Sequence, residues 1–164
     1  MIQKDSVNIR PVKKEDNPQL AEVLRKVLLE MGVPKKGTAY EDKALDCMFE
    51  TYNKSYKSYF VVTKGDEILG GAGIAPLEQA DPDICELQKM YFLPVVRGKG
   101  IGSAMMQTCL DFARTRGFKK CYLETMPTMH EARKLYKKTG FTDLDGAMGD
   151  TGHYNCKAWM IKNL

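Results

Sequence analysis

The sequence lacks the marks of a membrane protein and of a disordered chain. No stretch reaches the roughly eighteen apolar residues of a membrane-spanning helix, and the mean hydropathy is −0.39. The opening residues, Met-Ile-Gln-Lys-Asp-Ser, contain no apolar core of a secretion signal. With 43% hydrophobic residues and only seven prolines in 164 positions, the chain is also unlike a disordered segment. We therefore expect one folded domain, residues 1–164, with no membrane partner.

The five cysteines are odd in number, widely spaced, and form no Cys-x-x-Cys pair. They favour neither a disulfide framework nor a zinc site, so we expect no bound metal. Reduced thiols are typical of the cytoplasm, which is the predicted location.

The charge balance is only mildly basic. Lys and Arg number 25 and Asp and Glu number 21, which gives a net charge of +4. The excess lies in lysine doublets rather than in one block, which is typical of solvated faces, although it would also suit a small polyanion. We expect no nucleic-acid partner. The doublets are at residues 13–14, 35–36, 119–120 and 137–138.

Hydrophobic periodicity predicts an α+β (mixed α/β) domain with elements in the order βααβββαβαβ(β). Turn residues follow the expected strands. The second and third strands are separated only by residues 64–67, which favours a hairpin. Strands are expected at residues 6–12, 59–63, 68–74, 84–93, 120–125 and 153–161.

Four helices are expected, each with a recognisable start. Asn17 can cap the first helix. Thr38 and Glu41 have the spacing of a capping box for the second, and Thr128 and Glu131 have the same spacing for the fourth. The third is expected to begin near residue 100, after a glycine-rich turn.

The densest signal is that turn, Arg-Gly-Lys-Gly-Ile-Gly at residues 97–102, between an apolar strand and an amphipathic helix. Glycines allow the backbone to turn tightly and to approach a ligand, and a helix N-terminus presents free N–H groups there. Phosphate oxygens are the natural occupant. Arg97 and Lys99 add positive charge where a polyphosphate would lie.

Other interpretations of the turn are weaker. A Walker A loop is excluded because the chain contains no GxxxxGK[ST] segment. Gly98, Gly100 and Ser103 nearly give the GxGxxG pattern of a dinucleotide loop, and Glu124 ends the next strand. However, this unit begins past the middle of the chain, which leaves too few residues for a six-stranded parallel sheet. A turn that holds no ligand would not require three glycines and two cations.

Two segments resemble signatures of the Gcn5-related N-acetyltransferase (GNAT) superfamily. Residues 97–102 are similar to its (Q/R)xxGxG pyrophosphate loop, and Met-Tyr-Phe-Leu-Pro at 90–94 resembles the strand that precedes it. Residues 132–141 are similar to its AxxLYxxxGF segment. The expected order of strands and helices also resembles that of the superfamily, so the resemblance covers essentially the whole chain. It implies a mostly antiparallel twisted sheet flanked by helices.

The resemblance implies acetyl-CoA as the donor. Loop amides would hold its pyrophosphate and the preceding strand its pantetheine arm. One position departs from the superfamily pattern, since Met129 stands where members commonly carry an asparagine that contacts this arm. The implied cofactor residues are Met90, Tyr91, Phe92, Arg97, Gly98, Lys99, Gly100, Ile101, Gly102 and Ser103.

The resemblance also implies the catalytic groups of a direct transfer to a primary amine. It places the hydroxyl of Tyr136 near the CoA sulfur, where it would protonate the leaving thiolate. Glu86, in an apolar strand, is our first candidate for the base, because burial would raise its pKa toward neutrality. Glu124 is the second candidate, and His153 is a third.

A covalent route through cysteine is not favoured. Cys109 lies on the apolar stripe of a helix and Cys121 in a strand, and neither has a histidine placed to activate it.

Together, these features lead us to expect an acetyl-CoA-dependent N-acetyltransferase, whose acceptor is a small-molecule or peptide amine that the sequence does not specify. A non-catalytic acyl-CoA sensor is the alternative, and a homodimer stays open.

Overall fold

The computed structural model describes residues 6–164, and the opening residues examined for a secretion signal lie largely outside this part. Its strands are β1 (Val7–Pro11), β2 (Ser58–Lys64), β3 (Glu67–Pro76), β4 (Ile84–Phe92), β5 (Lys120–Thr125), β6 (Thr142–Leu144) and β7 (Ala158–Asn163). Its α-helices are α1 (Asn17–Glu30), α2 (Met48–Tyr52), α3 (Ile101–Thr115) and α4 (His130–Thr139). This order confirms the predicted α+β arrangement.

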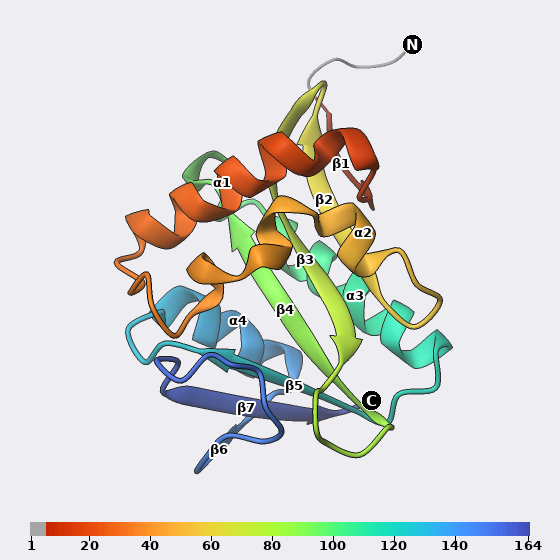
Figure 1. Ribbon diagram of the computed structural model, residues 1–164, viewed down its shortest axis with the longest axis vertical. Coiled ribbons are helices and arrows are strands. Elements are labelled where there is room, and N and C mark those ends of the chain that lie inside the picture. The colour runs from red at the N-terminus through yellow and green to blue at the C-terminus, as the bar shows by residue number, and fades with distance from the viewer. Residues whose placement is uncertain (1–5) are drawn as a thin grey trace.

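Within residues 6–164, the strands form one seven-stranded sheet in the order β1-β2-β3-β4-β5-β7-β6. Every neighbouring pair is antiparallel except β4 and β5, which run parallel. Helices cover both faces, with α1 and α2 in front and α3 and α4 behind in Figure 1. The sheet is therefore mostly antiparallel and flanked by helices, as the resemblance implies.

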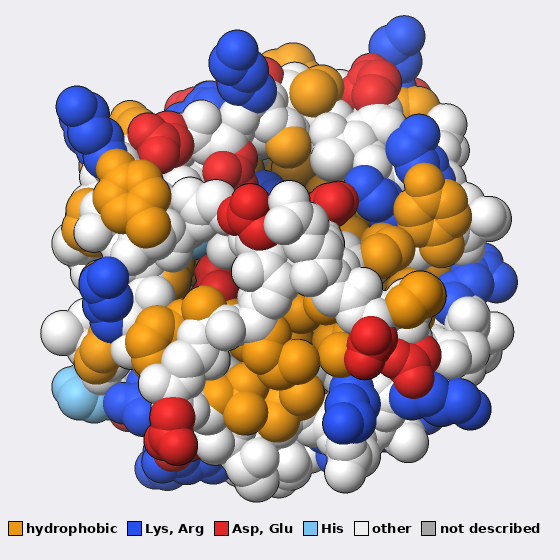
Figure 2. Space-filling view, turned by 60° about the horizontal axis from the view of Figure 1, so that its bottom comes forward, with side chains coloured by type: hydrophobic (Ala, Val, Ile, Leu, Met, Phe, Trp, Pro, Cys, Tyr) orange, Lys and Arg blue, Asp and Glu red, His pale blue; other side chains and the backbone are white. Residues whose placement is uncertain are grey.

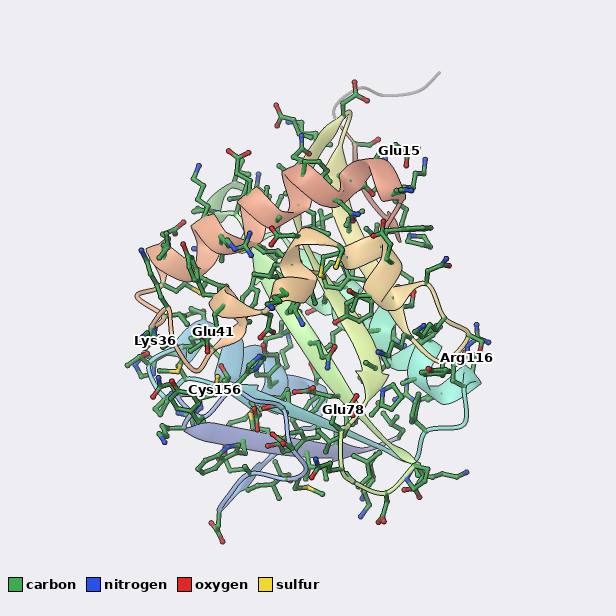
Figure 3. All side chains as sticks on the ribbon, viewed as in Figure 1. Glu15, Lys36, Glu41, Glu78, Arg116 and Cys156 are labelled. Carbon is green, nitrogen blue, oxygen red and sulfur yellow. The ribbon has the colours of Figure 1, made fainter. Side chains whose placement is uncertain are left out.

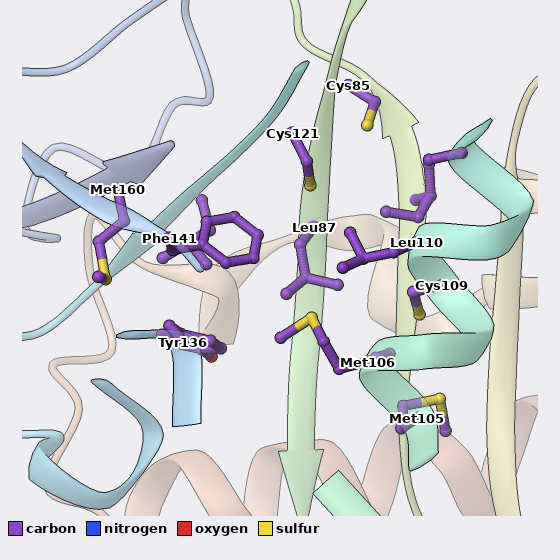
Figure 4. Packing of buried hydrophobic residues seen from close by; sticks show 14 of the residues in the cluster. Cys85, Leu87, Met105, Met106, Cys109, Leu110, Cys121, Tyr136, Phe141 and Met160 are labelled. Atoms are coloured by element: carbon purple, nitrogen blue, oxygen red, sulfur yellow. The ribbon is translucent and has the colours of Figure 1, made fainter. Parts of the chain in front are cut away.

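Each face of the sheet has its own core. Leu20, Leu24 and Leu28 of α1 pack with Leu45, Met48 and Tyr52 against one face. On the other face, Met105, Met106 and Cys109 of α3 and Tyr136 of α4 pack against Cys85, Leu87 and Cys121 (Figure 4). The apolar stripes predicted for the helices thus face the sheet.

The second predicted helix is wrong for most of its length. In place of a helix from Thr38, the chain forms two 3₁₀ turns, Ala39–Glu41 and Lys43–Asp46, before the short α2. Asp42 separates the turns with an extended backbone, φ −62° and ψ 121°. Its carboxylate is bound by side chains from distant segments, described below, and these contacts outweigh local helix propensity.

The capping predictions also need correction. Asn17 is already inside α1, where its amide accepts from the Phe49 N–H (2.9 Å) and so fixes the start of α2. Met129, not Thr128, is the N-cap of α4, and no side chain caps this helix. Thr38 does accept from the Tyr40 N–H, at 3.4 Å, but the Glu41 carboxylate binds the N–H of Gly37 at 2.8 Å instead of closing the box.

The last predicted strand begins too early. β7 starts at Ala158, and residues 145–157 form a loop, the tail loop, that crosses the front of the sheet. Its Asn155 amide donates to the carbonyl of Lys36 (2.6 Å), and its Asp150 N–H donates to the carbonyl of Glu78 (2.8 Å). In Figure 3, Cys156 of this loop lies beside the segment that carries Lys36 and Glu41.

Two glycines of β3 let a tyrosine lie against the strand. A Cβ atom at Gly71 or Gly73 would stand 2.5 or 2.6 Å from the Tyr59 ring, so only glycine allows this approach. The Tyr59 hydroxyl then reaches the carbonyl of Lys89 at 2.7 Å. Lys89 lies at a bulge of β4, where the register against β3 shifts and its own φ is +51°.

The surface in Figure 2 shows Lys and Arg side chains spread around the edge of the face, among acidic ones. Hydrophobic side chains gather in the lower middle of this view. None of the helices formed by residues 6–164 is both long and apolar enough to cross a membrane.

Candidate functional site

The glycine loop connects β4 to α3 through a tight turn. Gly98 and Gly100 have φ angles of +74° and +78°, and Gly100 is the N-cap of α3. A Cβ atom at either glycine would have no atom of residues 6–164 within 4 Å. The space beside the loop is therefore open, at the point where the first turn of α3 has unpaired N–H groups.

A groove of about 300 Å³ runs beside this loop, between β4, α3 and α4. Two of the predicted cofactor residues are not part of its lining: Lys99 is exposed, and Ile101 packs against the core. Glu131 lies on the opposite wall, so the groove is not uniformly basic. The predicted residues that line it are Met90, Tyr91, Phe92, Arg97, Gly98, Gly100, Gly102 and Ser103.

Arg97 has a different environment from the one expected. Its guanidinium donates to the carbonyl of Phe92 at 2.7 and 3.0 Å and to the Glu30 carboxylate at 3.0 Å. The side chain thus fastens the loop to β4 and to the end of α1. Backbone N–H groups, rather than a free arginine, are left to face an anion in the groove.

The inner end of the groove lies where β4 and β5 separate. The two strands pair only between residues 84–86 and 120–122. Beyond Glu86, a cavity of about 50 Å³, the chamber, opens between them. It shares Met90, Tyr91 and Tyr136 with the groove, so the two spaces adjoin. Lys89, Glu124 and Cys156 also line the chamber.

Tyr136 lies between the groove and the chamber and lines both. Its ring meets Phe141 edge to face, with centroids 6.1 Å apart. Within residues 6–164, its hydroxyl has no hydrogen-bond partner in the protein, and burial raises its pKa. A protonated phenol that is free to donate therefore stands at the junction.

Glu86 is 6% exposed, on the face of β4 opposite Leu87. Burial raises the pKa of its carboxyl to about 7, although a hydrogen bond from Gln88 (2.6 Å) opposes the shift. It does not line the chamber itself but lies at the point where the strands diverge. Such a group exchanges a proton near neutral pH.

Glu124 lies in the chamber wall, and both of its oxygens accept hydrogen bonds. The Tyr122 hydroxyl donates to one oxygen at 2.6 Å, and the Thr151 hydroxyl of the tail loop donates to the other. These bonds orient the carboxylate. The structure thus brings Glu86, Glu124 and Tyr136 to one region, while their environments differ.

His153, the third candidate, is bound to an acidic partner. Its Nε2 lies 2.8 and 3.1 Å from the two oxygens of Asp42. Burial alone would lower the pKa of His153, but Asp42 outweighs this effect and raises it. The Asp42 carboxylate also lies 3.5 Å from the Lys89 ammonium.

Sequence reasoning missed both Asp42 and Lys89. The only sequence signal for Lys89 was its charge within an otherwise apolar strand. A lysine at an exposed edge of the sheet would give the same pattern. Asp42 gave no signal, because its partners lie 47 and 111 positions away along the chain. Together with His153, these two residues form a charged cluster beside the chamber.

The cysteines considered as nucleophiles are poorly placed for that role. Cys109 and Cys121 are fully buried in the core behind the sheet, and burial together with contacts to Cys85 raises the pKa of both thiols (Figure 4). Cys156 does line the chamber, and burial raises its pKa to about 12. None of these three thiols is substantially ionised at neutral pH.

Among residues 6–164, no group of three His, Cys, Asp or Glu side chains is placed to hold a metal ion.

Met129, at the position where the resemblance leads one to expect asparagine, lies in the chamber wall. Its sulfur accepts a hydrogen bond from the Thr125 hydroxyl at 3.3 Å, and its side chain packs against the core under α1. The side chain therefore links the start of α4 to this core and offers no amide at the groove.

Comparison with known proteins agrees with this geometry. Residues 24–141 match the model of the acetyltransferase (GNAT) family. The chain is 43% identical to the Escherichia coli K12 protein named uncharacterized N-acetyltransferase YjgM, over 95% of this chain and 94% of that protein.

Solved structures share the fold at low sequence identity. A GNAT-family acetyltransferase of Staphylococcus aureus Mu50 superposes with a TM-score of 0.85 at 18% identity, over 97% of this chain and 99% of that one. The PaiA N-acetyltransferase of Thermoplasma acidophilum, in complex with coenzyme A, gives 0.76 at 18% identity over 97% and 99%. With the family model covering most of the chain, this protein belongs to the GNAT family of N-acetyltransferases.

Proposed function

We propose that the protein transfers the acetyl group of acetyl-CoA directly to a primary amine of a small molecule or peptide. The observation that carries this proposal is the junction at Tyr136. There, an open groove that begins at a glycine loop meets a small chamber that has Glu124 in its wall and Glu86 at the point where its strands diverge. A binding module would need the groove, but it would not need an unpaired phenol and a titrating glutamate at its inner end.

The groove fits an elongated polyanion with an extended arm. The open space at Gly98 and Gly100 and the free N–H groups of α3 suit a pyrophosphate. The PaiA protein was solved with coenzyme A, which supports the same ligand here. When bound, acetyl-CoA would supply an activated acetyl thioester.

We assign the base to Glu86 and the acid to Tyr136. The Glu86 carboxyl, with a pKa of about 7, accepts a proton from an ammonium either directly or through one water molecule. Both oxygens of Glu124 already accept hydrogen bonds from hydroxyl groups, so its role is to orient the acceptor or its ammonium. The Tyr136 hydroxyl donates to the leaving sulfur.

The free thiols of the described chain suit a reducing compartment, and the cytoplasm is our proposed location. The acceptor would approach from the side framed by α1, the two 3₁₀ turns and the tail loop. A non-catalytic acyl-CoA sensor is the alternative, and the assay that follows separates it from an enzyme.

The test is release of CoA from acetyl-CoA in the presence of a panel of amines, polyamines, amino acids and peptides. At least one primary amine should be acetylated. Tyr136→Phe should lower kcat about 10²-fold with little change in acetyl-CoA affinity. Tyr56→Phe is the matched control, because Tyr56 is exposed and lines neither the groove nor the chamber. Binding of CoA with no turnover on any amine would support the sensor.

The base is identified by its pH profile. Glu86→Gln should lower kcat/KM about 10²-fold at neutral pH. The deficit should shrink as the pH rises toward the pKa of the amine, because the acceptor then arrives deprotonated. If Glu86→Gln is near wild type while Glu124→Gln or His153→Gln shows this recovery, the base is that residue.

A further inference from the structure

Lys89 occupies an unusual position for a lysine. It lies at the bulge of β4 with a left-handed backbone, and the Tyr59 hydroxyl holds its carbonyl. A non-glycine residue in this conformation is uncommon and carries strain. Its side chain is only 8% exposed and lines the chamber. The fold therefore holds an ammonium group in a buried place that a smaller or apolar residue would fill more easily.

The ammonium is connected to Glu86 through side chains. It lies 5.9 Å from the centre of the Tyr52 ring. The Tyr52 hydroxyl donates to the Gln88 side-chain oxygen, and the Gln88 amide donates to Glu86 at 2.6 Å. Lys89 and Glu86 thus occupy the two ends of one buried polar network on β4.

Two basic side chains, Lys89 and His153, face the carboxylates around this network. Asp42 brings one negative charge, but it faces both Lys89 at 3.5 Å and His153 at 2.8 Å. When His153 is protonated, two cations therefore share one carboxylate. Glu86 and Glu124 are the other carboxylates that act on this cluster, and its titratable neighbours include Tyr52, Tyr91 and Cys156.

Burial and positive charge act in opposite directions on Glu86. Burial and the charge of Glu124 raise its pKa, while Gln88, His153 and Lys89 lower it, and the net pKa is about 7. Burial alone would also lower the pKa of Lys89, but Tyr52, Asp42 and Glu86 raise it, so the side chain stays charged. A fixed positive charge thus acts on a carboxyl that burial would otherwise keep protonated.

We propose that Lys89 is a positioning residue for the transfer reaction: its buried ammonium, held by Asp42 and Tyr52 beside the chamber, favours the ionised form of the Glu86 carboxyl, which accepts the proton of the amine. This inference rests on the proposed function only in assigning the base to Glu86. The electrostatic link between the two side chains is independent of turnover.

The test is a titration of the Glu86 carboxyl by ¹³C NMR in the full-length protein labelled at glutamate, with its resonance assigned by its loss in Glu86→Gln. Lys89→Met removes the charge at similar length and should move the midpoint upward. Lys89→Arg keeps the charge and should titrate close to wild type. Lys89→Gln is a second neutral variant, which decides the matter if the methionine variant does not fold.

The kinetics give a parallel measurement once an accepted amine is known. The acidic limb of the kcat/KM profile should move upward with the NMR midpoint in the neutral variants and return in Lys89→Arg. An unchanged midpoint in the neutral variants, or an equal shift in Lys89→Arg, would overturn the inference. If instead Glu86→Gln retains full kcat/KM while the midpoint still depends on Lys89, the link stands and only the choice of base is wrong.

Discussion

Arg97 and Glu30 form an ion pair at 3.0 Å that joins the glycine loop to the last residue of α1. The arginine was expected to add charge to the groove, yet its guanidinium binds this carboxylate and the carbonyl of Phe92. We therefore expect it to contribute to ligand binding by holding the loop in place.

This relationship gives the first prediction. Arg97→Gln should weaken CoA binding by about 1 to 2 kcal/mol, because the loop loses its anchor. Glu30→Gln should weaken binding by less, and the double variant should be no worse than Arg97→Gln alone. Calorimetric titration with CoA measures all three. Tighter binding in Glu30→Gln would mean that a released Arg97 contacts the ligand directly, contrary to this interpretation.

A side chain at Gly100 should block the groove. Gly100→Glu places a carboxylate in the open space beside the loop, so CoA binding should be lost through both steric overlap and repulsion. Gly117→Glu is the matched control, because Gly117 also has a positive φ and open surroundings but follows α3 at its other end. Both variants should lose about 1 to 2 kcal/mol of stability to backbone strain. Near-normal CoA affinity in a folded Gly100→Glu protein would rule out the assigned groove.

Stability should fall as the pH rises through the range in which Glu86 ionises. Its pKa is about 7 in the folded protein and 4.5 as an ordinary glutamate, so the folded state binds the extra proton between these values. The free energy of unfolding should therefore decrease by about 3 kcal/mol from pH 4.5 to pH 7 through this group. Glu86→Gln should remove this part of the slope.

Urea unfolding at several pH values tests this dependence. His153, whose pKa is also raised, loses stabilisation as the pH rises through its folded pKa, so Glu86→Gln should keep a smaller slope. Glu22→Gln, at an exposed glutamate of α1, should retain the wild-type slope. Equal slopes in wild type and Glu86→Gln would show that the buried carboxyl does not titrate in this window.

Transfer should proceed without an acetylated cysteine. Cys156→Ser should keep its kcat, although this thiol lines the chamber, because its pKa of about 12 leaves little thiolate at neutral pH. Cys109→Ser and Cys121→Ala should lose stability but not turnover, because both thiols are fully buried. Intact mass after incubation with acetyl-CoA alone should show no added acetyl group. A gain of one acetyl on a cysteine, or parallel double-reciprocal plots, would reverse this expectation.

Features set by local chemistry could be predicted from the sequence. The positive φ angles of Gly98 and Gly100, the helix that follows them, and the strand before them all depend on neighbouring residues. The same holds for the placement of Tyr136 on the buried face of α4, which follows from helical spacing.

Features set by distant partners could not be predicted. The helix expected from Thr38 is broken at Asp42, whose carboxylate binds Lys89 and His153. The ion pair of Arg97 could not be predicted for a similar reason, since Glu30 lies 67 positions away. No local pattern encodes such ion pairs, because they exist only after the sheet and the tail loop have assembled.

The route of the tail loop has a consequence for the order in which the site is completed during synthesis. All the residues that line the groove lie between Met31 and Tyr136, so the binding surface for the donor is encoded before the last segment emerges. The side from which we propose that the acceptor approaches is completed later, because Thr151 and His153 reach Glu124 and Asp42 only when the chain returns across the sheet. The tail loop, which contributes Cys156 to the chamber lining and binds Glu124 and Asp42, is therefore synthesised after every residue of the groove.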